Sequence, residues 1–226
     1  MSRSSLARLL HLSSQTLPIG GYSHSQGLES AIERQVVTDQ ASLQRWIGDC
    51  LEYTFRSFEI PCLLAMFAAW TAEDLGLVAS LNDDYLASRE SHELRLAAVQ
   101  MGHSLRALLN VLPDLPPALS AQLNAIEEPV LPCAWSAAAS AWRIEPVEAA
   151  IGYLWSWAEN QVLVAMKTLP LGQSAGHRLL LEVSPRFSAV AEDCAASAGR
   201  PWSNFAPGFA ILSSQHETQY SRLFRS

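Results

Sequence analysis

The apolar positions of this chain repeat with the period of an α-helix along most of its length. Between Leu43 and Phe58 they recur at intervals of three and four residues, with Thr54 completing the stripe and Thr38 in position to cap the helix. The segment from Pro61 to about Leu81 is apolar on most sides. A helix of that kind is buried, so we expect other helices to surround it.

Proline and capping residues divide the rest of the first half. Asn82 and Asp83 are candidate caps, and the stripe that follows runs from Leu94 to Leu112 and stops at Pro113. Six of the twelve prolines lie within residues 113–146. We therefore expect short helices joined by turns in that part of the chain.

The second half repeats the helical pattern. Pro146 opens a long helix that Pro170 ends, and a further helix is expected around Ser174–Val183. The next is expected over Pro185–Ala198, with Ser184 as its cap and Gly199 as its end. No segment combines strand periodicity with hairpin turns. The sequence therefore predicts an all-α bundle of about ten helices.

Composition bounds this picture further. The chain has 226 residues, of which 49% are hydrophobic and 16% charged, against about 25% charged in average globular proteins. No Ser/Gly-rich or charged linker separates two cores, so we expect a single domain over residues 1–226. The surplus of apolar helix surface predicts self-association, as a homodimer.

Charge and residue spacing exclude several classes of protein. Subtracting 22 acidic from 15 basic side chains gives a net charge of −7, which argues against nucleic-acid and membrane-surface binding. The longest apolar run, Ile60–Trp70, is short of the roughly 20 residues of a membrane span, and we recognise no signal peptide, so a cytoplasmic protein is expected. The four scattered cysteines are expected to be small buried residues, and the six histidines form no paired ligand motif. We expect no metal site and no cofactor.

A glycine-rich stretch, Pro18–Glu29, does not fit the helical pattern, and we call it the glycine segment. It has neither the phosphate-binding loop nor the dinucleotide fingerprint. The letters GYSHS resemble the nucleophile turn of a hydrolase, but the last position is Ser25 instead of glycine. A turn that joins two helices is one interpretation. A stand-alone helical enzyme built around Ser23, His24 and Glu159 is another.

The C-terminal tail, about residues 200–226, is the second exception. Its aromatic residues, among them Trp202, Phe205 and Tyr220, follow no helical period. Tyrosine and arginine together are typical of protein interfaces. We expect a partner to order the tail, and its removal to abolish binding without unfolding the domain. A purely structural helical oligomer is a third alternative.

Four stretches carry a resemblance to a known family: LHLSSQTLPIGGYSHSQGLE, SHELR with the following QMG, GYLWSWAENQVLVAMKTLPLGQ, and SSQHETQYSRLFRS. In this order they resemble the UreF family of urease accessory proteins. The resemblance implies an all-α, dimeric scaffold without enzymatic activity. Such a scaffold binds the accessory protein UreD, called UreH in some organisms, recruits and tunes the GTPase UreG, and so helps insert nickel into apo-urease.

The resemblance and the two irregular segments together give a set of candidate partner-binding residues. Most of them lie in an N-terminal segment of about residues 1–30 and in the tail, and the others lie on or just after the long helix between. They are Pro18, Gly20, Gly21, Tyr22, Ser23, Ser25, Gln26, Gly27, Glu29, Glu159, Asn160, Lys167, Pro170, Gly172, Gln173, His216, Glu217, Tyr220, Ser221, Arg222, Leu223, Phe224 and Arg225.

Overall fold

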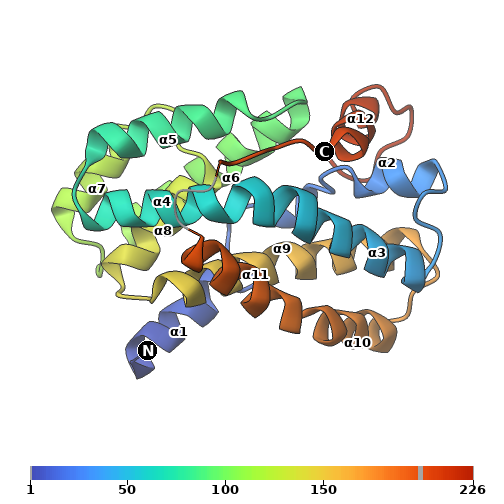
Figure 1. Ribbon diagram of the computed structural model, residues 1–226, viewed down its shortest axis with the longest axis horizontal. Helices are drawn as coiled ribbons and strands as arrows, with labels where there is room; N and C mark the ends of the chain where they lie inside the picture. Colours follow the sequence, from blue (N-terminus) through green and yellow to red (C-terminus); the bar gives the residue numbers. More distant parts are fainter. Residues whose placement is uncertain (1, 198–200, 226) are drawn as a thin grey trace.

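A computed structural model describes residues 2–197 and 201–225, and within them the secondary structure is helical, without a strand (Figure 1). The all-α prediction is therefore confirmed. The elements are α1 (Arg3–Leu12), η1 (Gly21–Ser23), α2 (Leu28–Glu33), α3 (Gln40–Cys50), η2 (Leu51–Glu59), α4 (Ile60–Thr71), α5 (Leu75–Ala87), α6 (His92–Val111), α7 (Pro117–Asn124), α8 (Leu131–Ala141), α9 (Pro146–Thr168), α10 (Gln173–Val183), α11 (Pro185–Ala196) and α12 (Pro207–His216).

Two helices form the centre of the bundle. The helix α4 contacts η2, α5, α8, α9 and α11, and α9 contacts α1, α2, α3, α10 and α11. In α4 the side chains of Leu63 and Met66 are fully buried, as expected for a helix that others surround. At the ends of the molecule lie α7 on one side and α2 with α12 on the other (Figure 1). This arrangement brings the glycine segment and the tail to the same end.

The central helix is shorter than the sequence predicts. It ends at Thr71, and after Glu73, which has a φ of 57°, the carboxylate of Asp74 accepts a hydrogen bond from the backbone of Leu77 and starts α5. The predicted caps Asn82 and Asp83 are wrong, because both residues lie inside α5. The side chain of Asn82 instead binds the backbone between α7 and α8.

The segment before α4 contains a change of helix type. Its cap is Asp39, not Thr38: the Asp39 carboxylate accepts from the backbone of Ser42, whose hydroxyl in turn accepts from the Asp39 backbone. The stripe then continues through η2, which is a π-helix. A π-helix has wider turns than an α-helix and is common at functional sites.

The remaining helices largely agree with the sequence. The predicted long helices are α6 and α9, and the proline-rich region forms the short helices α7 and α8. Ser184 does not cap α11, because it has helical backbone angles and its hydroxyl donates to the carbonyl of Leu181. The helix ends at Ala196, and the predicted stop at Gly199 lies outside the described residues.

The described part of the tail, residues 201–225, lies against the bundle. Contrary to the expectation of no helix, it forms α12, which packs on α2 and α6. The preceding stretch crosses the bundle, with the Ser203 backbone donating to the Ser57 carbonyl and the Asn204 amide to the Ser88 carbonyl (Figure 1). These residues are placed without a partner, contrary to the expectation that a partner orders the tail, whereas the effect of removing the tail stays a prediction.

The four cysteines are free and buried, as predicted. Trp135 and Trp142 are buried in the core, and Trp155 and Trp157 pack against it. In the part of the chain that the structure describes, none of the helices combines the length and apolar character needed to cross a bilayer.

Candidate functional site

The glycine segment forms the connection from α1 to α2. Gly20 and Gly27 have φ angles of 75° and 85°, which an L-residue rarely adopts. Gln26 also has a positive φ, of 50°. Backbone strain of this kind persists only where surrounding contacts fix it.

Side chains of α9 supply such contacts. The amide of Asn160 donates to the carbonyl of His24 at 2.8 Å, and that of Gln161 donates to the carbonyl of Ser25 at 3.1 Å. The Gln161 oxygen accepts from the indole of Trp46 at 3.0 Å. All three side chains are buried. The long helix therefore holds the backbone of the glycine segment in its conformation.

The same geometry bears on the enzyme alternative. The Ser23 hydroxyl donates its proton to the Gly20 carbonyl at 2.7 Å, so that proton is not directed at a base. The Glu159 carboxylate accepts from the amide of Gln15, which lies in the turn after α1, at 3.1 Å. Burial, and secondly the charge of Arg225, lowers the pKa of His24 to about 4. An imidazole with that pKa is a weak general base.

The tail is attached through His216, whose side chain is completely buried at the end of α12. Its Nε2 lies 2.9 Å from a carboxylate oxygen of Glu29 on α2, and its Nδ1 lies 2.6 Å from one of Glu93 on α6. Carboxylates only accept hydrogen bonds when they are ionised. In that state both contacts require the doubly protonated, cationic imidazole.

The residues after His216 use the same two carboxylates. Arg222 donates to Glu93 at 2.8 Å. The backbone N–H groups of Leu223 and Phe224 donate to Glu29 at 2.7 and 3.1 Å. We call Glu29, Glu93, His216 and Arg222 the tail anchor. Hydrogen bonds to charged groups are stronger than neutral ones, so this set fixes the path of the tail.

Further contacts join the tail to its neighbours. The Arg225 backbone donates to the Ser23 carbonyl at 2.8 Å, which places the end of the tail beside the glycine segment. The Glu217 carboxylate accepts from the backbone of His92 at the start of α6, at 2.8 Å. The ammonium of Lys167, in the last turn of α9, lies 5.3 Å from the centre of the Phe224 ring.

The structure thus separates the candidate residues into two groups. The exposed ones are Pro18, Tyr22, Lys167, Pro170, Gly172, Gln173, Tyr220, Ser221, Arg222, Leu223 and Arg225. The buried ones are Ser25, Gly27, Glu29, Asn160, His216 and Phe224. The others, Gly20, Gly21, Ser23, Gln26, Glu159 and Glu217, are partly buried. The buried side chains position the segments, whereas the exposed ones are accessible to a partner.

Three residues of the site are absent from the sequence-based set. Glu93 lies within the SHELR stretch, and Gln161 directly follows two candidates, so their neighbours in sequence could have indicated them. Trp46 has only the signature of a core residue. Among residues 2–197 and 201–225, no group of three or more histidine, cysteine, aspartate or glutamate side chains is arranged to hold a metal ion.

The chain is similar to proteins of a known family over most of its length. The family model described as UreF matches residues 37–184. The urease accessory protein UreF of Azoarcus sp. (strain BH72) is 51% identical over 223 residues, covering 98% of this chain and 95% of the relative. That of Dechloromonas aromatica is 50% identical, covering 98% and 97%. Urease accessory protein UreF 2 of Pseudomonas syringae pv. tomato is 46% identical, covering 96% and 97%.

Proposed function

Since the chain belongs to the UreF family of urease accessory proteins, we propose that it is a scaffold in urease maturation. In this proposal it binds UreD (UreH) and through that complex recruits and tunes the GTPase UreG. The complex then helps to insert nickel into apo-urease in the cytoplasm. The chain itself is neither the GTPase nor the metal carrier.

One observation supports this function above the others. The four stretches that carry the family resemblance lie far apart in the sequence, yet they meet at one end of the molecule. The tail contacts the glycine segment through Arg225 and Ser23, and it contacts the SHELR stretch through Arg222 and Glu93. The Asn160 side chain of α9 donates to the His24 carbonyl in the glycine segment. Convergence of this kind favours one composite surface for binding a protein.

The surface has the side chains that an interface needs. Tyr220 is fully exposed, Leu223 is 71% exposed and Tyr22 is 62% exposed. Exposed aromatic and aliphatic side chains of this size, next to arginine, are typical binding hot spots. Because buried carboxylates hold the tail, these side chains are presented in a fixed arrangement, which lowers the entropy cost of binding.

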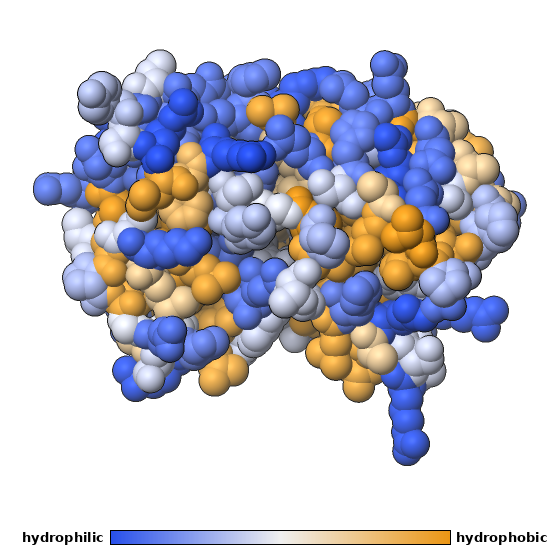
Figure 2. Space-filling view, turned by 180° about the vertical axis from the view of Figure 1, so that it is seen from behind, coloured by the Kyte–Doolittle hydropathy of each residue, from blue (hydrophilic) through white to orange (hydrophobic). Residues whose placement is uncertain are grey.

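We also propose that the scaffold is a homodimer. The described residues expose several large apolar side chains apart from the tail, including Leu10, Val111 and Leu181. On the face seen in Figure 2, apolar side chains reach the surface in two regions with polar side chains between them. Sedimentation of the purified chain at increasing concentration tests this part, and a monomer at tens of micromolar, roughly the range of weak dimers, would contradict it.

The main test is capture by UreD. Tyr220 and Leu223 are replaced together by serine, and the control is Asp83→Ser, at an exposed position of α5. We expect the double variant to keep its melting temperature and to bind tagged UreD at least about tenfold more weakly, because tenfold corresponds to about 1.4 kcal/mol and a hot spot contributes about 2 kcal/mol or more. We expect the control to bind normally. Unchanged capture by the double variant would reject this surface.

A second measurement addresses the function as a whole. Cells that express urease without this chain should contain inactive urease, and expression of the chain should restore activity together with recovery of a UreD–UreG complex. GTP hydrolysis by the purified chain, free of UreG, would contradict the scaffold proposal.

A further inference from the structure

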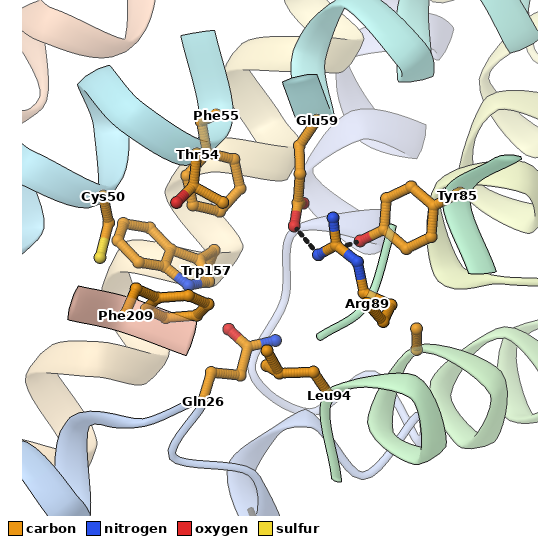
Figure 3. A pocket seen from close by; sticks show the side chains of 11 residues that line it. Gln26, Cys50, Thr54, Phe55, Glu59, Tyr85, Arg89, Leu94, Trp157 and Phe209 are labelled. Carbon is orange, nitrogen blue, oxygen red and sulfur yellow. Dashed lines mark hydrogen bonds and ion pairs between the residues drawn. The ribbon is translucent and has the colours of Figure 1, made fainter. Parts of the chain in front are cut away.

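Two small cavities lie inside the bundle, between the glycine segment, η2 and α9. The first encloses about 20 Å³ and is bordered by Thr54, Glu59 and Arg89 among others (Figure 3). The second encloses about 50 Å³ and is bordered by Glu59, Tyr153 and Asn160 among others. Gln26, Glu59 and Trp157 border both cavities. One water molecule needs at least 10–15 Å³, so each cavity is large enough.

Each cavity is also bordered by a residue that has a buried polar atom without a hydrogen bond. The hydroxyl oxygen of Thr54 and the amide oxygen of Asn160 are buried and have no partner in the part of the chain that the structure describes. The two residues are 3% and 8% exposed. An unsatisfied buried polar group costs about 1–3 kcal/mol. Native proteins satisfy most such groups, frequently with ordered water.

Glu59 offers a shared partner. One carboxylate oxygen accepts from Arg89 at 2.8 Å, and the other accepts from the Tyr153 hydroxyl at 3.3 Å. A carboxylate can accept about four hydrogen bonds, so both oxygens keep further capacity. Figure 3 shows this carboxylate facing the Arg89 guanidinium, with the Gln26 side chain pointing into the same space. A water in either cavity therefore has several polar partners.

We propose that both cavities bind ordered water, one molecule bonding to the Thr54 hydroxyl and another to the Asn160 oxygen, with Glu59 as their common acceptor. The waters link η2 to α9 across the core. A water that donates to the Asn160 oxygen also fixes the orientation in which the Asn160 nitrogen donates to the His24 carbonyl. The hydrated cavities thereby position the backbone of the glycine segment.

Thr54→Val tests the proposal by the sign of its effect. If the hydroxyl is dry and unsatisfied, valine removes a buried unpaired group, and the melting temperature should rise. If the hydroxyl binds water, valine removes a hydrogen bond, and the melting temperature should fall by about 2–4 °C, corresponding to roughly one hydrogen bond in a chain of this size. We expect the fall.

The matched control is Thr168→Val. The Thr168 hydroxyl donates to the carbonyl of Val164 in its own helix and lines neither cavity. Oxygen-17 relaxation dispersion of the solvent counts long-lived internal waters in each protein. We expect fewer in Thr54→Val than in the unsubstituted chain, and no change in the control. A rise in the melting temperature, or an equal number of waters in Thr54→Val, would overturn the proposal.

A crystal structure of the unsubstituted chain gives an independent readout that does not require the variant to fold. Electron density for water within hydrogen-bond distance of the Thr54 hydroxyl and of the Asn160 oxygen would support the proposal. Well-resolved cavities without such density would contradict it.

Discussion

His216 and Glu29 are 187 positions apart in the chain, yet Nε2 of the imidazole lies 2.9 Å from a carboxylate oxygen of the glutamate. The other ring nitrogen of His216 contacts one carboxylate oxygen of Glu93, and Arg222 donates a hydrogen bond to the second oxygen of Glu93. Two potential cations thus oppose two buried carboxylates. Each member depends on the others, because a buried charge without a partner is strongly unfavourable.

Replacement of His216 should therefore be costly. In His216→Phe both Glu29 and Glu93 lose a buried partner, and breaking a buried pair costs about 3–5 kcal/mol. At roughly 2–4 °C per kcal/mol in a chain of this size, the melting temperature should fall by about 10 °C. Thermal unfolding followed by circular dichroism measures the effect. His177→Phe, at an exposed position of α10, is the control and should change little. Equal melting temperatures would show that His216 does not stabilise the fold.

The Glu29 carboxylate should govern access to the tail. Glu29→Gln keeps the shape of the side chain but removes the charge that accepts from His216 and from the Leu223 and Phe224 backbone. A charged hydrogen bond contributes about 1.5–3 kcal/mol, so detachment of the tail should become roughly tenfold more frequent or more. Trypsin should then cleave after Arg222 correspondingly faster, as measured by mass spectrometry. Glu33→Gln, exposed on the same helix, is the matched control, and equal cleavage of both variants would reject the role of Glu29.

The periodic part of the fold could be predicted from the sequence, because it depends on local pattern. The stripes of α6 and α9 and the prolines at their ends define those helices within a few residues. The helix α12 escaped prediction because its apolar residues lie in its first half and its polar residues in its second half, so that no apolar face repeats along it. Nor does any local signal distinguish the π-helix η2 from the α-helical stripe that it continues.

The site shows a similar division. The glycine segment and the tail stand out in the sequence because they interrupt the helical pattern. Their attachment to each other does not stand out, since it depends on Glu29 and His216, which are 187 positions apart. Glutamate in the first turn of a helix and histidine in the last turn usually indicate caps exposed to solvent. Only the tertiary structure shows that both are buried.

His24 should make stability depend on pH. Burial, and secondly the charge of Arg225, lowers its pKa from 6.5 to about 4. Between these values the unfolded chain binds more protons at this position than the folded chain, so the free energy of unfolding falls as the pH falls. At about 1.4 kcal/mol per pH unit, the total loss from pH 7 to pH 4 is about 3 kcal/mol. In His24→Gln this contribution should be absent. Urea unfolding of both proteins across this range measures the difference, and parallel stability curves would contradict the prediction.

Gly102 should be intolerant of any side chain, although its backbone is helical. It lies on α6 where that helix meets the start of α8, and a Cβ atom at this position would overlap the Pro129 carbonyl and lie 2.7 Å from the Val130 carbonyl carbon. Alanine in an open helical position is more favourable than glycine by about 0.5–1 kcal/mol. Here the backbone of the adjoining segment cannot move aside without disturbing α8, so overpacking should outweigh that gain and cost about 1–3 kcal/mol.

The control for Gly102→Ala is Gly208→Ala in α12, where an added Cβ would meet no atom within 4 Å. Propensity alone then applies, and this variant should be slightly more stable than the unsubstituted chain. The two alanine variants are therefore expected to shift the midpoint of urea unfolding in opposite directions. A shift to higher urea in both would mean that α6 and α8 are farther apart at Pro129 than the structure places them.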